Sequence, residues 1–323
     1  MRRRYPGQRC KMSDMNANRS MLRLLINGKS AQSPPLREAV EAVRKQGVRL
    51  EVQVTWEAGD AAMLTEQAGE AGASRLIVAG GDGTVNEAVN GLMRLPREAR
   101  PALGILPMGT ANDLATGLGI PEELKAALSL ALTASPRAVD VLRVGDHHFL
   151  NMLSAGFGAE ITASTPKSLK RLLGGGAYSL MGALKAWRFH ACPARLEWPG
   201  GEGRRELFLL AIGNGAQAGG GQQLSPMARL DDGLLEVLAV RQFSSLAGMR
   251  QMLGELKRLP ASGEFVEYWQ TDQIRVTADK PLPLTLDGEP HRLDHLDVEL
   301  APGAIDLLAP NDCPLLEHAA PAP

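Results

Sequence analysis

The sequence has few cysteines, no long apolar run and no excess of basic charge. Its three cysteines, Cys10, Cys192 and Cys313, are far apart and form no CxxC pair, so we expect neither a zinc site nor a disulfide framework and favour a reducing, cytoplasmic compartment. No apolar run approaches the roughly 18 residues that a membrane-spanning helix needs. The formal net charge of -1 argues against a nucleic-acid partner, because dedicated nucleic-acid binders are usually clearly basic.

The composition that remains is typical of a globular protein with a sizeable core. Of 323 residues, 44% are hydrophobic and 22% are charged, and this length suits two domains. The first twenty residues are rich in arginine, and no apolar stretch of the kind found in a signal peptide follows them before Leu22. We therefore predict a disordered basic tail over residues 1–20, or alternatively a true start at Met12, Met15 or Met21, and folded sequence from Met21.

Short apolar segments alternate with helical patterns over residues 21–140. This alternation predicts an α/β domain with a Rossmann-like parallel sheet that is covered on both faces. The expected strands are Met21–Asn27, Leu50–Trp56, Leu76–Ala79 and Ala102–Leu106, and the expected helices are Leu36–Lys45, Asp60–Ala71, Val85–Met93 and Ala111–Leu118.

Strand patterns dominate after about Val139, and helical patterns become fewer. This change predicts a second, mostly antiparallel β domain over residues 141–308, with residues 309–318 returning to the first domain. The expected strands are Val139–Val144, His148–Leu153, Leu207–Gly213, Leu234–Val240, Ile274–Thr277, Leu284–Leu286 and Val298–Leu300, and the expected helices are Lys167–Phe189 and Leu246–Arg258.

The strongest local signal is the glycine-rich turn AGGDGTVNE (Ala79–Glu87), which lies between a predicted strand and a predicted helix. Glycine allows close approach of the backbone to a ligand, and the start of the helix offers unpaired N–H groups that suit a phosphate. Asp82 would hold Mg²⁺ or a water molecule bound to it. A structural alternative stays open, because Thr84 and Glu87 have the spacing of a capping box.

A second turn, LPMGTANDLA (Leu106–Ala115), repeats the order strand, glycine, threonine, helix. Thr110 and Asp113 again have the spacing of a capping pair. Turns at the ends of successive parallel strands face the same crevice, where open α/β sheets bind ligands. The segment NGKS (Asn27–Ser30) ends like a Walker A loop, but Arg23 stands where that motif needs glycine.

These two turns and several later segments resemble the bacterial lipid kinases of the diacylglycerol kinase superfamily, in particular the YegS-like group. The resemblance runs from about Met21 to Leu316. NAD kinases share the GGDGT turn but are not expected to have the other segments. Those segments are GNGAQAGGGQQLSP (Gly213–Pro226), DDGLLEV (Asp231–Val237), LDGEP (Leu286–Pro290) and DCPLL (Asp312–Leu316).

The resemblance implies an α/β domain of the NAD-kinase and diacylglycerol-kinase type followed by a β-sandwich, with ATP between the two. Many relatives have an Asn-Pro pair and a glycine-containing loop after the first strand, so the role of Asn27–Ser30 stays open. Asp113 and Asp140 match acidic positions of the metal and phosphate network. The residues expected to bind ATP are Thr55, Gly81, Asp82, Gly83, Thr84, Val85, Asn86, Glu87 and Thr110.

The resemblance also implies catalytic residues. Glu289 matches the proposed general base, with Asp287 close by, and Asp82 is the third catalytic candidate because it would act with Mg²⁺. Which of Glu289 and Asp287 is the base stays open. Without the resemblance, Glu289 would be read as a solvated residue after a tight turn.

A structural metal site is implied at Arg229, Asp232 and Leu234, with Mg²⁺ or alternatively Ca²⁺ as the ion. Arg229 and Leu234 could contribute only backbone carbonyl groups, because neither side chain ligates such a cation. The sequence Asp231–Gly233 is equally typical of a plain hairpin turn between strands.

The expected function is an ATP- and Mg²⁺-dependent kinase that phosphorylates a hydroxyl group of a membrane lipid similar to diacylglycerol or phosphatidylglycerol. We expect a cytoplasmic protein in peripheral contact with the inner membrane. The basic and apolar segment Thr165–His190 would either rest on that membrane or pack against the core. A kinase for NAD or another soluble polyol and a nucleotide-sensing protein without turnover are the alternatives, and the acceptor lipid and the oligomeric state stay open.

Overall fold

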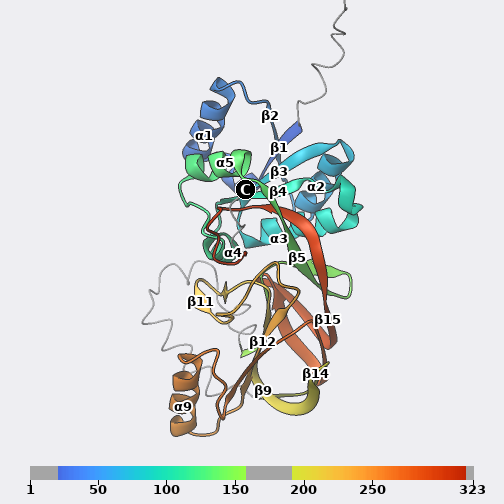
Figure 1. The fold of residues 1–323 in the computed structure, drawn as a ribbon, viewed down its shortest axis with the longest axis vertical. Coiled ribbons are helices and arrows are strands. Elements are labelled where there is room, and N and C mark those ends of the chain that lie inside the picture. Colours follow the sequence, from blue (N-terminus) through green and yellow to red (C-terminus); the bar gives the residue numbers. More distant parts are fainter. Residues whose placement is uncertain (1–20, 158–190, 318–323) are drawn as a thin grey trace, which may run out of the picture.

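A computed structural model describes residues 21–157 and 191–317 of the chain. The predicted tail over residues 1–20 and the predicted helix Lys167–Phe189 lie outside these residues. In the described part, thirteen strands form one sheet that runs through both halves of the molecule (Figure 1). The order of its main path is β13-β12-β9-β7-β14-β15-β4-β3-β1-β2, while β5, β6 and β8 pair beside this path.

The α/β half comprises residues 21–135 and holds the parallel part of the sheet. Its strands pair in parallel in the order β4-β3-β1-β2, as the alternating pattern predicts. In Figure 1, α1 and α5 lie on one side of these strands and α2 on the other. The strands are β1 (Met21–Ile26), β2 (Leu50–Val54), β3 (Ala73–Gly80) and β4 (Ala102–Pro107). The helices are α1 (Pro34–Lys45), α2 (Asp60–Glu70), α3 (Asp82–Arg94), α4 (Asp113–Gly117) and α5 (Leu124–Thr133), with 3-10 turns η1 (Gly28–Ser30) and η2 (Arg97–Ala99).

Local sequence explains why α1 begins and packs as it does. The Ser33 hydroxyl accepts a hydrogen bond from the Leu36 N–H, and prolines occupy the first helical positions, where a missing N–H costs nothing. Leu36, Ala39 and Val43 then recur on one face and are buried against the sheet.

The β-rich half comprises residues 136–157 and 191–308 and is mostly antiparallel. Two apolar clusters fill it, one between its strands and one beneath the helix α9. Its strands are β5 (Pro136–Val144), β6 (His147–Phe149), β7 (Met152–Gly156), β8 (Cys192–Trp198), β9 (Gly201–Gly213), β10 (Gln217–Ala218), β11 (Gln222–Gln223), β12 (Leu235–Arg241), β13 (Val266–Thr271), β14 (Gln273–Leu286) and β15 (Glu289–Leu308), and α9 spans Leu246–Leu256.

The long strand β15 connects the two halves, as Figure 1 shows. Near its start it pairs with β14, and near its end Leu307 pairs with Leu103 of β4. The chain that follows buries Cys313, Leu315 and Leu316 in the same apolar cluster as β1 and β3. The sheet is therefore continuous across the boundary between the halves.

Asp140 on β5 joins three segments that are distant in the sequence. Its side chain is buried, with 4% exposed. One carboxylate oxygen accepts the Gly303 N–H at 2.7 Å, and the other accepts the Gly233 N–H at 2.9 Å. Both glycines have positive φ, a conformation that a side chain would strain. The carboxylate thereby fixes β15 and the loop before β12 to β5.

We expect Asp140→Ala to lower the free energy of unfolding by about 2–4 kcal/mol, because it leaves two buried N–H groups without their charged acceptor. Urea denaturation measures this loss. The matched change Asp146→Ala, at an exposed position in the turn after β5, should stay within about 0.5 kcal/mol of the wild type. Equal midpoints for the two variants would contradict the structural role given to Asp140.

Candidate active site

The two glycine turns lie against one another at the carboxyl ends of β3 and β4. The Met108 N–H donates to the Gly80 carbonyl at 2.9 Å. A methyl group added to Gly81 would lie 2.8 Å from the Gly109 Cα atom, so only glycine permits this approach. The prediction that both turns face one crevice is therefore supported by direct contact between their backbones.

The helix α3 begins at Asp82, three residues before the predicted start at Val85. Its N-cap residue, Gly81, provides no side-chain hydrogen bond to the first turn. The Thr84 and Val85 N–H groups donate to the Gly81 carbonyl at 3.0 and 3.1 Å, whereas the Asp82 and Gly83 N–H groups have no backbone acceptor among the described residues. A helix start of this kind attracts anions. The Val85 side chain is buried, so only its backbone could take part in binding.

The capping box considered for Thr84 and Glu87 is wrong. The Thr84 hydroxyl accepts a hydrogen bond from the Asn27 amide at 2.9 Å. Glu87 instead accepts the N–H groups of Gly59 and Ala61, at 3.1 and 3.3 Å, and so caps the start of α2. The Glu87 side chain, predicted to bind ATP, therefore supports the neighbouring helix.

The segment Asn27–Ser30 belongs to the same site, which the failed Walker A pattern did not indicate. Besides the contact with Thr84, the Gly28 N–H donates to the Thr55 hydroxyl at 3.1 Å. A methyl group on Gly28 would lie 2.4 Å from the Thr55 carbonyl oxygen. The available signal is a glycine within two residues after the end of a buried strand, since Gly28, Gly81 and Gly109 all have this position.

Asp82 and Asp113 bring two carboxylates together at these turns. Asp82 Oδ1 accepts the Leu114 N–H at 3.3 Å. Burial raises the pKa of Asp82, and the nearby charge of Asp113 raises it further. A pair of close carboxylates favours a cation between or beside them.

Asp113 also connects the turns to the β-rich half. Its carboxylate accepts the N–H groups of Gly220 and Gly221 at distances between 2.8 and 3.1 Å. Both glycines have positive φ, of 89° and 96°. The capping pair considered for Thr110 and Asp113 is therefore wrong, and Thr110 lies exposed in its turn.

Asp287 and Gly288 form the two-residue turn between β14 and β15. Both have positive φ, of 47° and 90°, as a type I′ hairpin requires. Asp287 Oδ1 accepts the N–H groups of Asn151 and Met152, at 3.1 and 2.8 Å. Its Oδ2 accepts the Leu150 N–H and the Asn86 side-chain amide, at 3.0 and 3.1 Å. Burial raises the pKa of Asp287, whereas these donors lower it.

Glu289, the first residue of β15, reaches the first glycine turn. A methyl group on Gly83 would lie 2.7 Å from Glu289 Oε1. The residue is exposed, and within the described ranges no group donates a hydrogen bond to its carboxylate. The two neighbouring acids therefore have different surroundings. Hydrogen-bond donors hold the Asp287 carboxylate, whereas the Glu289 carboxylate lies beside the exposed glycine turn.

The residues of the predicted structural metal site lie before β12. Asp232 Oδ1 accepts the Leu234 N–H at 3.0 Å, and burial raises the pKa of Asp232. The Arg229 guanidinium pairs with Asp231 instead. Among the described residues, no group of three or more His, Cys, Asp or Glu side chains could hold a metal ion. A cation here would depend on one carboxylate and on carbonyl groups, which is the ligand set that the resemblance implies.

The hairpin alternative for Asp231–Gly233 is wrong. The strand that follows, β12, pairs with β9 and β13, whereas the preceding strand β11 pairs only with β10 among the described strands. This segment therefore joins two different sheets.

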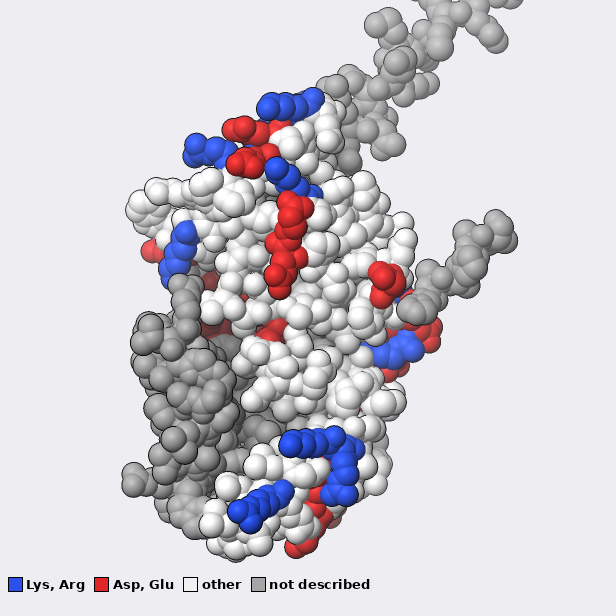
Figure 2. All heavy atoms as spheres, turned by 90° about the vertical axis from the view of Figure 1, so that its left-hand side faces the viewer, with Lys and Arg blue, Asp and Glu red and all other residues white. Residues whose placement is uncertain are grey.

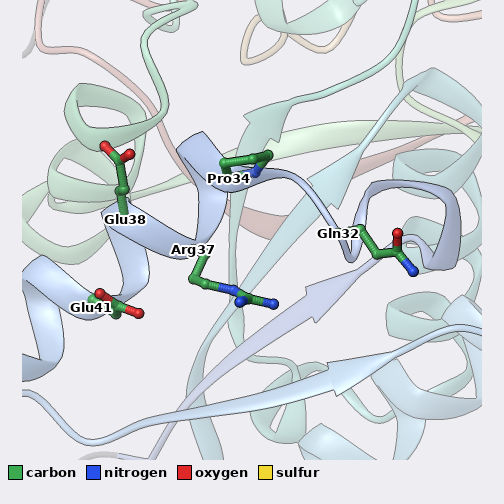
Figure 3. A pocket seen from close by; sticks show the side chains of 5 residues that line it. All are labelled: Gln32, Pro34, Arg37, Glu38 and Glu41. Atoms are coloured by element: carbon green, nitrogen blue, oxygen red, sulfur yellow. The ribbon is translucent and has the colours of Figure 1, made fainter.

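A pocket lies elsewhere, beside the start of α1 (Figure 3). It shares no residue with either glycine turn, and four of its five lining residues are polar or charged. It is lined by Gln32, Pro34, Arg37, Glu38 and Glu41.

Comparison with known proteins gives matches over nearly all of the folded chain. Residues 21–144 match the family model described as "Diacylglycerol kinase catalytic domain". Residues 151–309 match the "YegS C-terminal NAD kinase beta sandwich-like domain". The chain belongs to the YegS-like family of the diacylglycerol kinase superfamily. This assignment confirms the predicted fold class and the predicted enzyme class, a phosphotransferase with an alcohol group as acceptor.

Individual relatives agree with this assignment. A "Probable lipid kinase YegS-like" from Chromohalobacter salexigens is 58% identical over 91% of this chain and 95% of its own. A protein of the same name from Shewanella frigidimarina is 38% identical, over 91% of this chain and 96% of its own. The solved structure "A putative diacylglycerol kinase" from Bacillus anthracis str. Sterne has a TM-score of 0.75 and 26% identity, covering 91% of this chain and 98% of that one.

We expect Asp113→Asn to loosen the contact between the α4 start and the Gly220–Gly221 loop. The amide keeps one acceptor oxygen but turns an NH₂ group toward the backbone donors, which costs about 1–3 kcal/mol. Hydrogen exchange at these two glycine amides should therefore become at least about tenfold faster. Asp312→Asn, at an exposed position, is the matched control, and unchanged exchange in Asp113→Asn would refute this role.

Proposed function

We propose that this chain is an ATP-dependent lipid kinase that phosphorylates a hydroxyl group of a membrane lipid, such as diacylglycerol or phosphatidylglycerol. The observation that carries the proposal is the position of the Glu289 carboxylate over Gly83, where an acid from the β-rich half meets the glycine turn of the α/β half. The names of the relatives, which are probable lipid kinases, support the choice of a lipid acceptor.

The glycine turns would bind the phosphates of ATP. The Asp82 and Gly83 N–H groups at the start of α3 are suited to phosphate oxygens, and the absence of a side chain at Gly83 lets the Glu289 carboxylate approach this turn. The close carboxylates of Asp82 and Asp113 fit Mg²⁺ held directly or through water. When bound, Mg²⁺ would neutralise the charge of the phosphate groups. Thr55 and Asn27 would fix the neighbouring strand ends, and Thr110 would complete the site from the second turn.

Glu289 would act as the general base, and Asp287 would be a positioning residue. A base needs a carboxylate oxygen that can reach the acceptor hydroxyl, and Glu289 has such an oxygen at the open turn. The oxygens of Asp287 are held by three backbone N–H groups and Asn86. Asp287 would thus hold the hairpin tip, and Glu289 would take the hydroxyl proton as the acceptor oxygen attacks the phosphate.

Asp232 would hold a structural Mg²⁺ or Ca²⁺ together with the carbonyl groups of Arg229 and Leu234. The Asp232 carboxylate is exposed to solvent and so is open to a cation, and the resemblance to the family supports a site at this point. We place the enzyme in the cytoplasm, at the inner membrane surface. None of the described helices is long and apolar enough to cross a membrane. The lipid acceptor would be reached from the bilayer surface.

The direct test is transfer of label from γ-labelled ATP with Mg²⁺ to defined acceptors. We expect labelled diacylglycerol or phosphatidylglycerol when these lipids are presented in vesicles or mixed micelles. Labelling of NAD or a soluble polyol alone would replace the proposal with a soluble-acceptor kinase. ATP binding without transfer to any acceptor would instead favour a nucleotide sensor.

Substitutions at the two neighbouring acids should separate their roles. Glu289→Gln should lower kcat by about 10²–10⁴ through loss of the base, while its melting temperature and ATP affinity stay unchanged. Asp287→Asn should lower both activity and melting temperature, because it disturbs four hydrogen bonds. Asp82→Ala should abolish turnover and leave the fold intact. Asp294→Asn, at an exposed position on β15, is the control, and normal activity in Glu289→Gln would exclude it as the base.

A further inference from the structure

The helix α9 exposes two leucines on its outer face. Leu246 is 58% exposed and Leu253 is 47% exposed. With 3.6 residues per turn, Arg250 and Lys257 fall on the same side, so the four side chains share an arc of about 60°. These four residues, Leu246, Arg250, Leu253 and Lys257, are called the α9 stripe.

The opposite face of α9 is firmly attached to the β-rich half. Met252 is buried in the apolar cluster beneath the helix. The buried Glu255 carboxylate accepts the N–H groups of Glu264, Phe265 and Val266 at 3.1, 2.8 and 3.0 Å. These contacts fix the rotation of the helix about its axis, so the α9 stripe is held outward.

The charged residues of the α9 stripe itself are both basic, while the exposed Glu264 lies beside Gln251 of the same helix. Glu255 is the only acidic residue within the helix, and it is buried. Arg250 and Lys257 form no salt bridge with any residue in the described ranges. Figure 2 shows a group of basic side chains at the lower end of this face, at the level of α9 in Figure 1, with acidic side chains beside it.

We propose that the α9 stripe rests on the surface of an anionic phospholipid membrane. Basic side chains attract anionic headgroups, and leucines between them can enter the boundary between headgroups and acyl chains. Two leucines offer too little area for a stable protein interface, which needs about 800 Å² from each partner. The proposal rests on the proposed function for its purpose, since a kinase acting on a lipid must meet the bilayer. It uses residues other than the predicted segment Thr165–His190, which lies outside the described residues.

The test is co-sedimentation of the full chain, without ATP, with vesicles of phosphatidylglycerol and phosphatidylcholine. We expect binding that weakens with salt and is lost with phosphatidylcholine alone. The double variant Arg250→Glu/Lys257→Glu should bind at least about tenfold more weakly, because each basic residue contributes attraction and each glutamate adds repulsion. Leu246→Ser/Leu253→Ser should also weaken binding, and both variants should keep the wild-type melting temperature.

The matched control is Arg37→Glu/Lys45→Glu on α1, which makes the same change in net charge at exposed positions. It should bind vesicles like the wild type. Wild-type binding by the α9 variants, or equal weakening by the control, overturns the proposal. A changed oligomeric state in the α9 variants with intact vesicle binding also overturns it, because the stripe would then be a protein interface.

Failure of this proposal can be told apart from failure of the proposed function. Phosphorylation of a short-chain, water-soluble acceptor by the α9 variants should match the wild type, since the stripe lies apart from the glycine turns. If the wild type transfers no phosphate to any lipid while the α9 variants lose vesicle binding, the membrane contact stands and the proposed reaction falls.

Discussion

The Asp287 carboxylate is the contact on which the arrangement of the site depends. The backbone of Asp287 has a left-handed conformation, which is unfavourable for most residues with a side chain. It is also a charge largely removed from water, which is costly unless hydrogen bonds satisfy it. Donors from residues 150–152 and from Asn86 on α3 offset both costs. The hairpin tip is thereby fixed to the helix that carries the glycine turn, and Glu289 follows directly from that tip.

Asp113 and Asp140 use the same chemistry as Asp287. Each accepts two backbone N–H groups from glycines with positive φ, and each joins segments that are far apart in the sequence. Hydrogen bonds to a charged acceptor are stronger than neutral ones and fix direction as well as distance. Several glycine-rich segments of this chain therefore hold the molecule together, in addition to any role in binding a ligand.

The sequence predicts the positions of helices and strands better than the hydrogen-bond partners of individual side chains. Apolar periodicity correctly locates β1 to β4 and α1, because burial of one face or both faces leaves a local pattern. It places the start of α3 three residues late, since the glycines at Gly81 and Gly83 have low helix propensity although a first turn tolerates them. The capping boxes fail for another reason, since Thr84 and Glu87 bind Asn27 and Gly59. Asn27 follows β1 and Gly59 precedes α2, and no local spacing encodes such distant partners.

The length of β15 and the contact between Glu289 and Gly83 also could not be predicted from the sequence pattern. Only Val298–Leu300 is apolar enough to be expected as a strand, whereas β15 runs from Glu289 to Leu308. The contact between Glu289 and Gly83 spans 206 positions along the chain, so periodicity cannot reveal it. Resemblance to a family indicated Glu289, and the hydrogen bonds of Asp287 distinguish the two acids.

The uninterrupted path of β15 limits how the two halves can move. At about 3.3 Å per residue the strand is roughly 60 Å long, with the proposed base at its start and the parallel sheet at its end. A wide hinge motion between the two halves would have to bend β15. Its pairing with β5 is irregular between Ala301 and Ile305, and within this stretch the Gly303 N–H is hydrogen-bonded to the Asp140 carboxylate. The proposed nucleotide and acceptor would then enter and leave through shifts of side chains and turns, while the distance between the glycine turns and Glu289, the proposed base, stays nearly constant.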